Sequence, residues 1–163
     1  KRTQRIFYNM RSKAIVTLAD ANYFELLLEL IASIDKFDES KEVSVCVLDA
    51  GLTKEQIDIL SNKVENIKKA DWDIPIPSYK SRGRQWLKSQ VSRAFLPKYF
   101  PQFEKYLWID CDAWVSSWDA IKLYFKACDD GKLGITQSIG PGYKVLSKVK
   151  WISKASGEVP AVL

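Results

Sequence analysis

The sequence predicts an α/β fold in which helices flank a mostly parallel sheet. Short apolar runs of strand length alternate along the chain with segments whose apolar residues recur at helical spacing. Parallel neighbours need a crossover connection, and a helix between successive strands supplies it. In such sheets ligands bind outside the carboxyl ends of the strands, so polar residues at those ends are the first candidates for a site.

The elements follow from local patterns. Apolar runs bounded by turn residues predict strands at 14–18, 43–48, 64–74, 106–109 and 133–136. Helical spacing predicts helices at 22–35, 53–64, 85–99 and 118–128. Thr53 and Gln56 form a capping box at the start of the second helix, and Gly131 suits the end of the last. We expect one domain over 1–163, with a core at 14–137, a lead-in at 1–13 and a weakly patterned tail at 138–163.

Composition narrows the function classes. With 25 Lys and Arg against 20 Asp and Glu, the net charge of +5 predicts an anionic partner such as a nucleotide, a nucleic acid or a membrane surface. The sequence has no histidine, which excludes His-based triads and His-ligated zinc within it. Three cysteines without CxxC spacing fit a reducing compartment, so we expect a cytoplasmic protein, with peripheral membrane association left open.

Two closely spaced acidic residues are the most specific indication of a functional site. Asp110 and Asp112 stand one residue apart, directly after the apolar run 106–109. Strand periodicity would put both carboxylates on the same side. Carboxylate oxygens suit a hard divalent ion such as Mg²⁺ or Mn²⁺, which keeps open positions for water and substrate phosphates. We predict a metal–diphosphate site here; the alternative is a solvated turn at a strand end.

A basic segment precedes the acids. Between Asp73 and Glu104 there is no acid, and the basic residues there are Lys80, Arg82, Arg84, Lys88, Arg93 and Lys98. By default such side chains cover a solvated surface. Arg93 differs because it adjoins the apolar face of the predicted helix, where a guanidinium needs a phosphate or a carboxylate as partner.

Three further residues each allow two interpretations. Asp20, after the first strand, suits either a helix cap or a ligand contact. Tyr23, on the first helical turn, suits either core packing or stacking on a base. Cys111 should point to the strand face opposite the acids, which favours packing over thiol chemistry.

Three classes of function fit these features. A nucleotide-sugar transferase would use the acids to hold a metal on the diphosphate. A phosphohydrolase of the haloacid-dehalogenase kind also ends an apolar strand in Asp-x-Asp, but it expects Thr or Ser where Trp114 stands. A nucleic-acid-binding module fits the positive charge, but no RRM, KH or zinc signature is present, so we expect no nucleic-acid partner.

Three segments in the same order resemble glycosyltransferases of the GT-A fold, especially glycosyltransferase family 8. The turn Ala19-Asp20-Ala21-Asn22-Tyr23 resembles the family's Ala-Asp-x-Asn-Tyr turn. The stretch from Ser92 to Pro97 resembles the helix whose arginine lies near the sugar diphosphate. The stretch from Glu104 to Asp112 resembles the "DxD" strand. The resemblance therefore implies a Rossmann-like GT-A domain that binds a nucleotide sugar.

The resemblance also implies roles for single residues. Asp110 and Asp112 would ligate Mn²⁺ or Mg²⁺, Cys111 would touch the nucleotide through its backbone, and Arg93 would face the diphosphate or the donor sugar. The base and ribose pocket would be formed by Ala19, Asp20, Asn22 and Tyr23. No catalytic residue is assigned. The expected reaction transfers a hexose from a UDP-sugar donor to a saccharide or lipid-linked acceptor.

The sequence also departs from the family's pattern. The family's later Asn-x-Gly segment and its metal-binding histidine have no counterpart, and Gln137 and Ser138 stand near the position of a sugar-contacting aspartate. The chain begins at Lys1 rather than Met and stops abruptly at Leu163, so we expect the donor-binding half, with the C-terminal acceptor part missing. A nucleotide-sugar-binding domain without transfer activity is the alternative.

Overall fold

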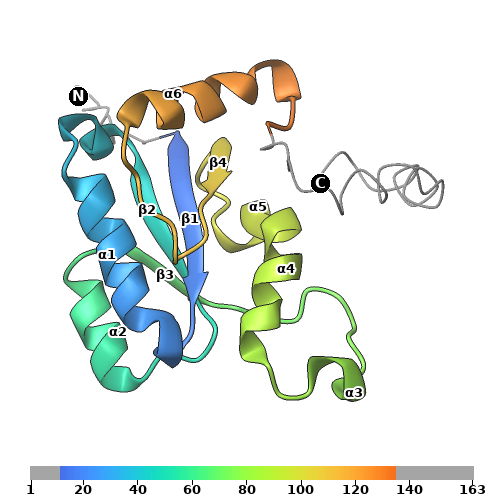
Figure 1. The fold of residues 1–163 in the computed structure, drawn as a ribbon. Coiled ribbons are helices and arrows are strands. Elements are labelled where there is room, and N and C mark those ends of the chain that lie inside the picture. Colours follow the sequence, from blue (N-terminus) through green and yellow to red (C-terminus); the bar gives the residue numbers. More distant parts are fainter. Residues whose placement is uncertain (1–11, 135–163) are drawn as a thin grey trace, which may run out of the picture.

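The computed structural model describes residues 12–134, which fold around a four-stranded sheet (Figure 1). The strands are β1 (Lys13–Ala19), β2 (Ser44–Asp49), β3 (Asn66–Lys69) and β4 (Lys105–Trp108). Their order across the sheet is β3-β2-β1-β4, and every neighbouring pair is parallel. The predicted α/β class is therefore confirmed.

Helices cover both faces of the sheet. The α-helices are α1 (Phe24–Asp35), α2 (Lys54–Ser61), α3 (Ser78–Ser81), α4 (Lys88–Ser92), α5 (Leu96–Tyr99) and α6 (Trp118–Ala127). The three longest, α1, α2 and α6, lie on the same face. Single 3₁₀ turns lie at Ala21–Tyr23, Asp38–Glu42, Gln85–Leu87, Arg93–Phe95 and Asp129–Gly131. Within residues 12–134, no helix is long and apolar enough to cross a membrane.

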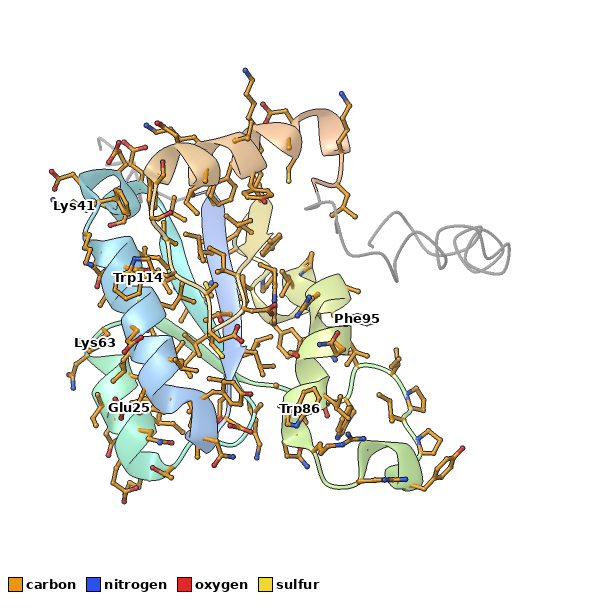
Figure 2. The ribbon with its side chains drawn as sticks, in the orientation of Figure 1. Glu25, Lys41, Lys63, Trp86, Phe95 and Trp114 are labelled. Atoms are coloured by element: carbon orange, nitrogen blue, oxygen red, sulfur yellow. The ribbon has the colours of Figure 1, made fainter. Side chains whose placement is uncertain are left out.

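The core has two sides, because alternate residues of β1 face opposite layers. Val16 and Leu18 pack against Leu96 and Phe100 of the α5 layer. On the other face, the apolar sides of α1, α2 and α6 cover the sheet. Glu25 and Lys63 lie on the outer surfaces of α1 and of the α2 region, while apolar side chains fill the space between the layers (Figure 2). β1 is buried from Ala14 to Ala19, as expected of a strand covered on both faces.

The capping box predicted at the start of α2 is present. The Thr53 hydroxyl accepts a hydrogen bond from the Gln56 backbone N–H at 3.2 Å, and the Gln56 side-chain oxygen accepts one from the Thr53 N–H at 2.9 Å. Gln56 also donates through its side-chain amide to the Ala21 carbonyl at 3.1 Å. The box therefore holds the start of α2 against the turn that follows β1.

We expect Thr53→Ala to lower the free energy of unfolding by about 1 kcal/mol, because it removes the cap from an N–H of the first turn. Thr53→Ser keeps the hydroxyl and should lose only a fraction of this. Urea unfolding followed by circular dichroism measures both variants. An alanine variant as stable as the wild type would mean that water satisfies this helix end equally well.

Several predicted elements differ from the structure. The helix predicted at 85–99 is a series of short helical segments. Between Arg93 and Pro97 the interruption has a local cause, since Pro97 lacks an N–H and a proline ring crowds the carbonyl four residues earlier. The strand predicted at 64–74 forms only at Asn66–Lys69. Leu133 and Gly134 are not in a strand, and the rest of that predicted element lies outside the described residues.

Candidate functional site

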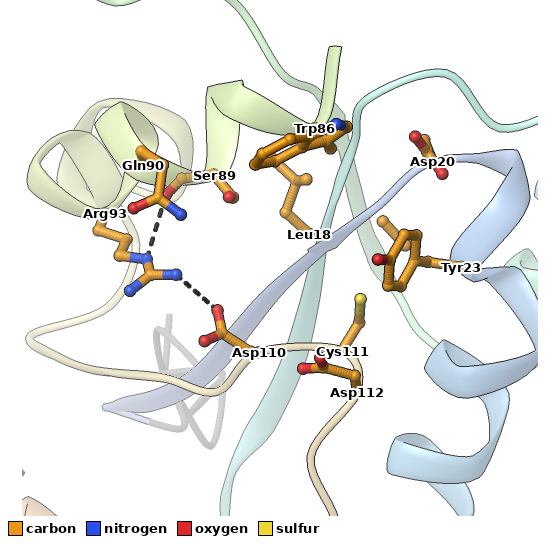
Figure 3. A pocket seen from close by; sticks show the side chains of 11 residues that line it. Leu18, Asp20, Tyr23, Trp86, Ser89, Gln90, Arg93, Asp110, Cys111 and Asp112 are labelled. Atoms are coloured by element: carbon orange, nitrogen blue, oxygen red, sulfur yellow. Dashed lines mark hydrogen bonds and ion pairs between the residues drawn. The ribbon is translucent and has the colours of Figure 1, made fainter. Parts of the chain in front are cut away.

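A pocket opens at the carboxyl ends of β1 and β4 (Figure 3). β1 connects to β2 on one side, while β4 joins the sheet on the other, so the order of the chain reverses between β1 and β4. This reversal is the place where open α/β sheets form their ligand crevice. The cavity measures about 190 Å³ and is lined by Leu18, Ala19, Asp20, Tyr23, Trp86, Ser89, Gln90, Arg93, Asp110, Cys111 and Asp112.

Asp110 is held by two donors from different elements. Its Oδ1 accepts hydrogen bonds from Arg93 Nη2 at 2.6 Å and from Trp108 Nε1 at 2.8 Å. The side chains of Arg93 and Asp110 are 39% and 54% exposed, so this ion pair contributes only about 0–1 kcal/mol to stability. The anion that Arg93 was predicted to need is thus a site carboxylate in this structure.

A turn, rather than the predicted strand, positions the carboxylates of Asp110 and Asp112. β4 ends at Trp108, and the Ala113 N–H donates to the Asp110 carbonyl at 3.0 Å, which closes a turn over 110–113. Strand alternation therefore does not place the two carboxylates, although both line the same pocket. β1 continues to Ala19, but the turn at 110–113 directs the backbone away from it.

The donor set suits a hard divalent cation. Among the described residues, Asp112 has no hydrogen-bond or ion-pair partner, and Asp110 uses only Oδ1. Both carboxylates of Asp112 and Asp110 thus keep oxygens available at the pocket, and carboxylate oxygens are the ligands that Mg²⁺ and Mn²⁺ prefer. Within residues 12–134, no cluster of three or more acidic, thiol or imidazole side chains forms a ready-made cage. A cation here would need ligands in addition to the side chains of residues 12–134.

Cys111 lies between the acids but packs inward. Its side chain is buried against Phe24 and Leu27 of α1. Burial, reinforced by the negative charge of Asp112, raises the pKa of the Cys111 thiol to about 11. The thiol therefore stays protonated at neutral pH and is a poor nucleophile. The predicted packing role is confirmed, although the turn rather than strand alternation produces it.

The turn after β1 is held from several sides. Asp20 Oδ1 accepts from the Asn22 N–H at 2.9 Å, so Asp20 does cap the following helical turn. The Ala21 N–H donates to the Gly51 carbonyl at 3.2 Å, which ties the turn to the loop after β2. Asp20 also lines the pocket, so its cap and pocket positions are compatible.

The remaining predicted residues of this turn divide between two cavities. Ala19 and Tyr23 line the pocket with the acids, and Tyr23 is 42% exposed, so its core-packing interpretation is wrong. Asn22 lines a second cavity of about 380 Å³ that shares Asp20 and Trp86 with the first. Asp49, at the end of β2, lines neither cavity, and its side chain accepts hydrogen bonds from the backbone N–H groups of Gly51 and Leu52.

Arg93 belongs to the helical layer formed by the short helical segments of residues 85–99. Its Nε donates to the Ser89 carbonyl at 3.1 Å, and its guanidinium carbon lies 5.0 Å from the centre of the Trp108 ring. Nearby, the buried Lys88 ammonium donates to the Ala70 carbonyl at 3.0 Å and so ties α4 to the end of β3. These contacts fix α4 over the sheet and point Arg93 at the acids.

Four pocket residues were absent from the predicted set: Leu18, Trp86, Ser89 and Gln90. Leu18 could have been inferred as the side chain next to the end of the first strand. Ser89 and Gln90 lie three or four residues before Arg93, which is one turn of a helix, so helical spacing pointed to them. Trp86 had no local signal.

One of the comparisons with known proteins identifies the family. The model of glycosyl transferase family 8 matches residues 14–133. Two crystal structures of the galactosyltransferase LgtC, one in complex with donor and acceptor sugar analogs and one of an active-site mutant, each show 24% identity and a TM-score of 0.49 over 66% of this chain. The chain spans 41% of the length of those LgtC chains. No curated protein matches it. Because the family model covers most of the sequence, the chain belongs to glycosyl transferase family 8, as the resemblance and its GT-A class of fold predicted.

Proposed function

We propose that this domain binds a UDP-sugar and serves the metal-dependent transfer of its hexose to a saccharide or lipid-linked acceptor. The family supports a transferase. The observation that carries the donor assignment is the pocket itself, which gathers Asp20 and Tyr23 from the end of β1 with Arg93, Asp110 and Asp112. A nucleoside diphosphate needs both a polar and aromatic end for its nucleoside and a cationic end for its phosphates.

Asp110 and Asp112 are the residues that would hold Mn²⁺ or Mg²⁺. A divalent cation, when bound, neutralises charge that develops on the departing UDP. With two carboxylates from the protein, the donor's phosphates and water would complete the coordination. The exposure of Asp110, 54% of its side chain, leaves the oxygens accessible to such ligands.

Arg93 is the residue proposed to meet the diphosphate. A guanidinium carries five N–H donors. One is used on the Ser89 carbonyl and one on Asp110 Oδ1, so the others remain for phosphate oxygens. Charge-assisted hydrogen bonds of this kind are stronger than neutral ones and favour negative charge as it grows on the leaving group.

The nucleoside end is proposed at the turn after β1. Asp20 uses Oδ1 on the Asn22 N–H, and its second oxygen suits a ribose hydroxyl. Tyr23 offers an exposed ring, Ala19 lines the same pocket, and Asn22 offers an amide from the neighbouring cavity. The backbone of Cys111 would contact the nucleotide, since its thiol is turned into the core. No side chain is proposed as a nucleophile.

Isothermal titration of the full chain with UDP, in Mn²⁺ and in EDTA, tests this function. UDP should bind measurably more tightly in Mn²⁺, and Mn²⁺ should bind more tightly in UDP by the same factor, since coupling between two ligands is reciprocal. Saturating both should raise the melting temperature, with a stabilisation of about 2.7 kcal/mol at 100 times the Kd.

Equal UDP affinity in Mn²⁺ and EDTA would remove the metal from the proposal. Absence of UDP binding in both would refute the donor site. Binding without any transfer or hydrolysis of a UDP-sugar would instead favour the alternative of a nucleotide-sugar-binding domain without activity. Mass spectrometry of the released UDP and hexose separates that case from a working transferase.

A further inference from the structure

Trp86 stands at the junction of the two cavities. It belongs to the 3₁₀ turn Gln85–Leu87, at the start of the helical layer that carries Arg93. Its side chain lines the pocket that contains the acids and also the second cavity beside it. It is 41% exposed, so much of the largest apolar side chain type in proteins stays out of the core. An aromatic surface in this position is available to a ligand.

Tyr23 faces the same space from the other side. In Figure 3 the Trp86 indole and the Tyr23 ring lie on different sides of the pocket, with Leu18 below the indole and Asp20 at the same end. Arg93 and Asp110 lie at the opposite end. The pocket therefore has an aromatic end with the Asp20 carboxylate and a charged end with Arg93 and Asp110, while Asp112 lies beside Cys111.

The two sides of the indole are not equivalent. The Arg84 guanidinium carbon lies 5.8 Å from the ring centre, and Arg84 lines the second cavity but not the first. This arrangement puts a cation on the side of the ring toward the second cavity. Tyr23 and the acids line the first cavity, which Arg84 does not line.

We infer that Trp86 is the second aromatic wall of the donor pocket and stacks on the planar base of the nucleotide, opposite Tyr23. The inference rests on the proposed function, because it needs a nucleoside diphosphate in this pocket. Stacking on Trp86 and Tyr23 would leave the diphosphate directed toward Arg93 and Asp112. Because every base has a π face, the wall adds affinity for the base, while polar groups such as Asp20 select among bases.

Calorimetric titration of Trp86→Ala with Mn²⁺–UDP and, separately, with Mn²⁺–pyrophosphate tests the inference. Base stacking on an aromatic side chain corresponds to a loss of roughly 5- to 150-fold on truncation to alanine. UDP affinity should fall by that factor, whereas pyrophosphate, which has no base, should bind as in the wild type. Trp86→Phe keeps a ring and should recover most of the UDP affinity.

Trp114 provides a matched control. It is 52% exposed and has a cation, Lys36 Nζ, 4.2 Å from its ring centre, but it belongs to neither cavity's lining. Figure 2 shows it beside α1, away from Trp86. Trp114→Ala should leave both affinities unchanged.

Two outcomes overturn the inference while the proposed function stands. One is unchanged UDP affinity in Trp86→Ala. The other is an equal loss for UDP and pyrophosphate, which would show that Trp86 supports the shape of the pocket rather than the base. If the wild type binds pyrophosphate but shows no extra affinity for UDP, the donor proposal fails as well, and both are rejected together.

Discussion

Asp112→Asn should weaken Mn²⁺-dependent UDP binding by about 100-fold or more while leaving the fold intact. Loss of a group that merely supports a metal ligand costs about 10- to 100-fold in affinity, and loss of a ligand itself should reach at least the upper end. Asp112 has no hydrogen-bond or ion-pair partner among residues 12–134, so its replacement breaks no contact in that part of the chain. Stability should therefore change by less than about 0.5 kcal/mol.

Titration calorimetry with UDP in Mn²⁺ and in EDTA measures the effect, and thermal unfolding checks the fold. Asp58→Asn is the matched control, since Asp58 is exposed on α2 and the same charge is removed far from the pocket. The control should bind like the wild type. If Asp112→Asn keeps the Mn²⁺-dependent affinity, the metal assignment to this residue is wrong.

Asp110→Asn should affect more than metal binding. It also weakens the charge-assisted hydrogen bond with Arg93, whose donors then have a neutral acceptor. Reduced UDP affinity in EDTA as well as in Mn²⁺ is therefore expected for Asp110→Asn but not for Asp112→Asn. Comparing the two variants therefore separates the effect of losing a metal ligand from the effect of losing the hydrogen-bond partner of Arg93.

Phe100→Ala should lower the free energy of unfolding by about 3–5 kcal/mol, because truncating a buried Phe removes its packing and leaves a cavity. Phe100 is completely buried at the end of α5, against Val16 and Leu18 of β1. A domain of this size has a total stability of about 5–15 kcal/mol, so the variant should unfold at a much lower temperature. Urea unfolding measures the loss.

Two comparisons make this result specific. Leu123 on α6 is 66% exposed, and Leu123→Ala should cost less than about 0.5 kcal/mol. Phe100→Leu fills part of the cavity and should fall between the alanine variant and the wild type. A loss below about 1 kcal/mol for Phe100→Ala would mean that the α5 layer closes over the site without strain.

Local patterns were sufficient for much of the fold. The apolar run of β1, the helical spacing of α1 and the Thr53 capping box each involve residues that are close in sequence, and each formed where it was predicted. Asp110 and Asp112, predicted as a pair from one segment, both line the pocket. These features depend on backbone geometry and burial along one element, which a single segment contains.

The arrangement of the site required the tertiary structure. Arg93 and Asp110 are 17 residues apart, and Asp20 and Trp86 meet only because β1 and the helical layer end at the same edge of the sheet. The break at Pro97 and the turn after Trp108 then set where these side chains point. A pattern within one segment carries no information on which other segment packs beside it, since that is decided by burying apolar faces together. For this reason the sequence alone predicted Asp110, Asp112, Arg93 and the turn after β1 as candidate site residues, whereas the place of Trp86 in the pocket lining emerged only from the folded chain.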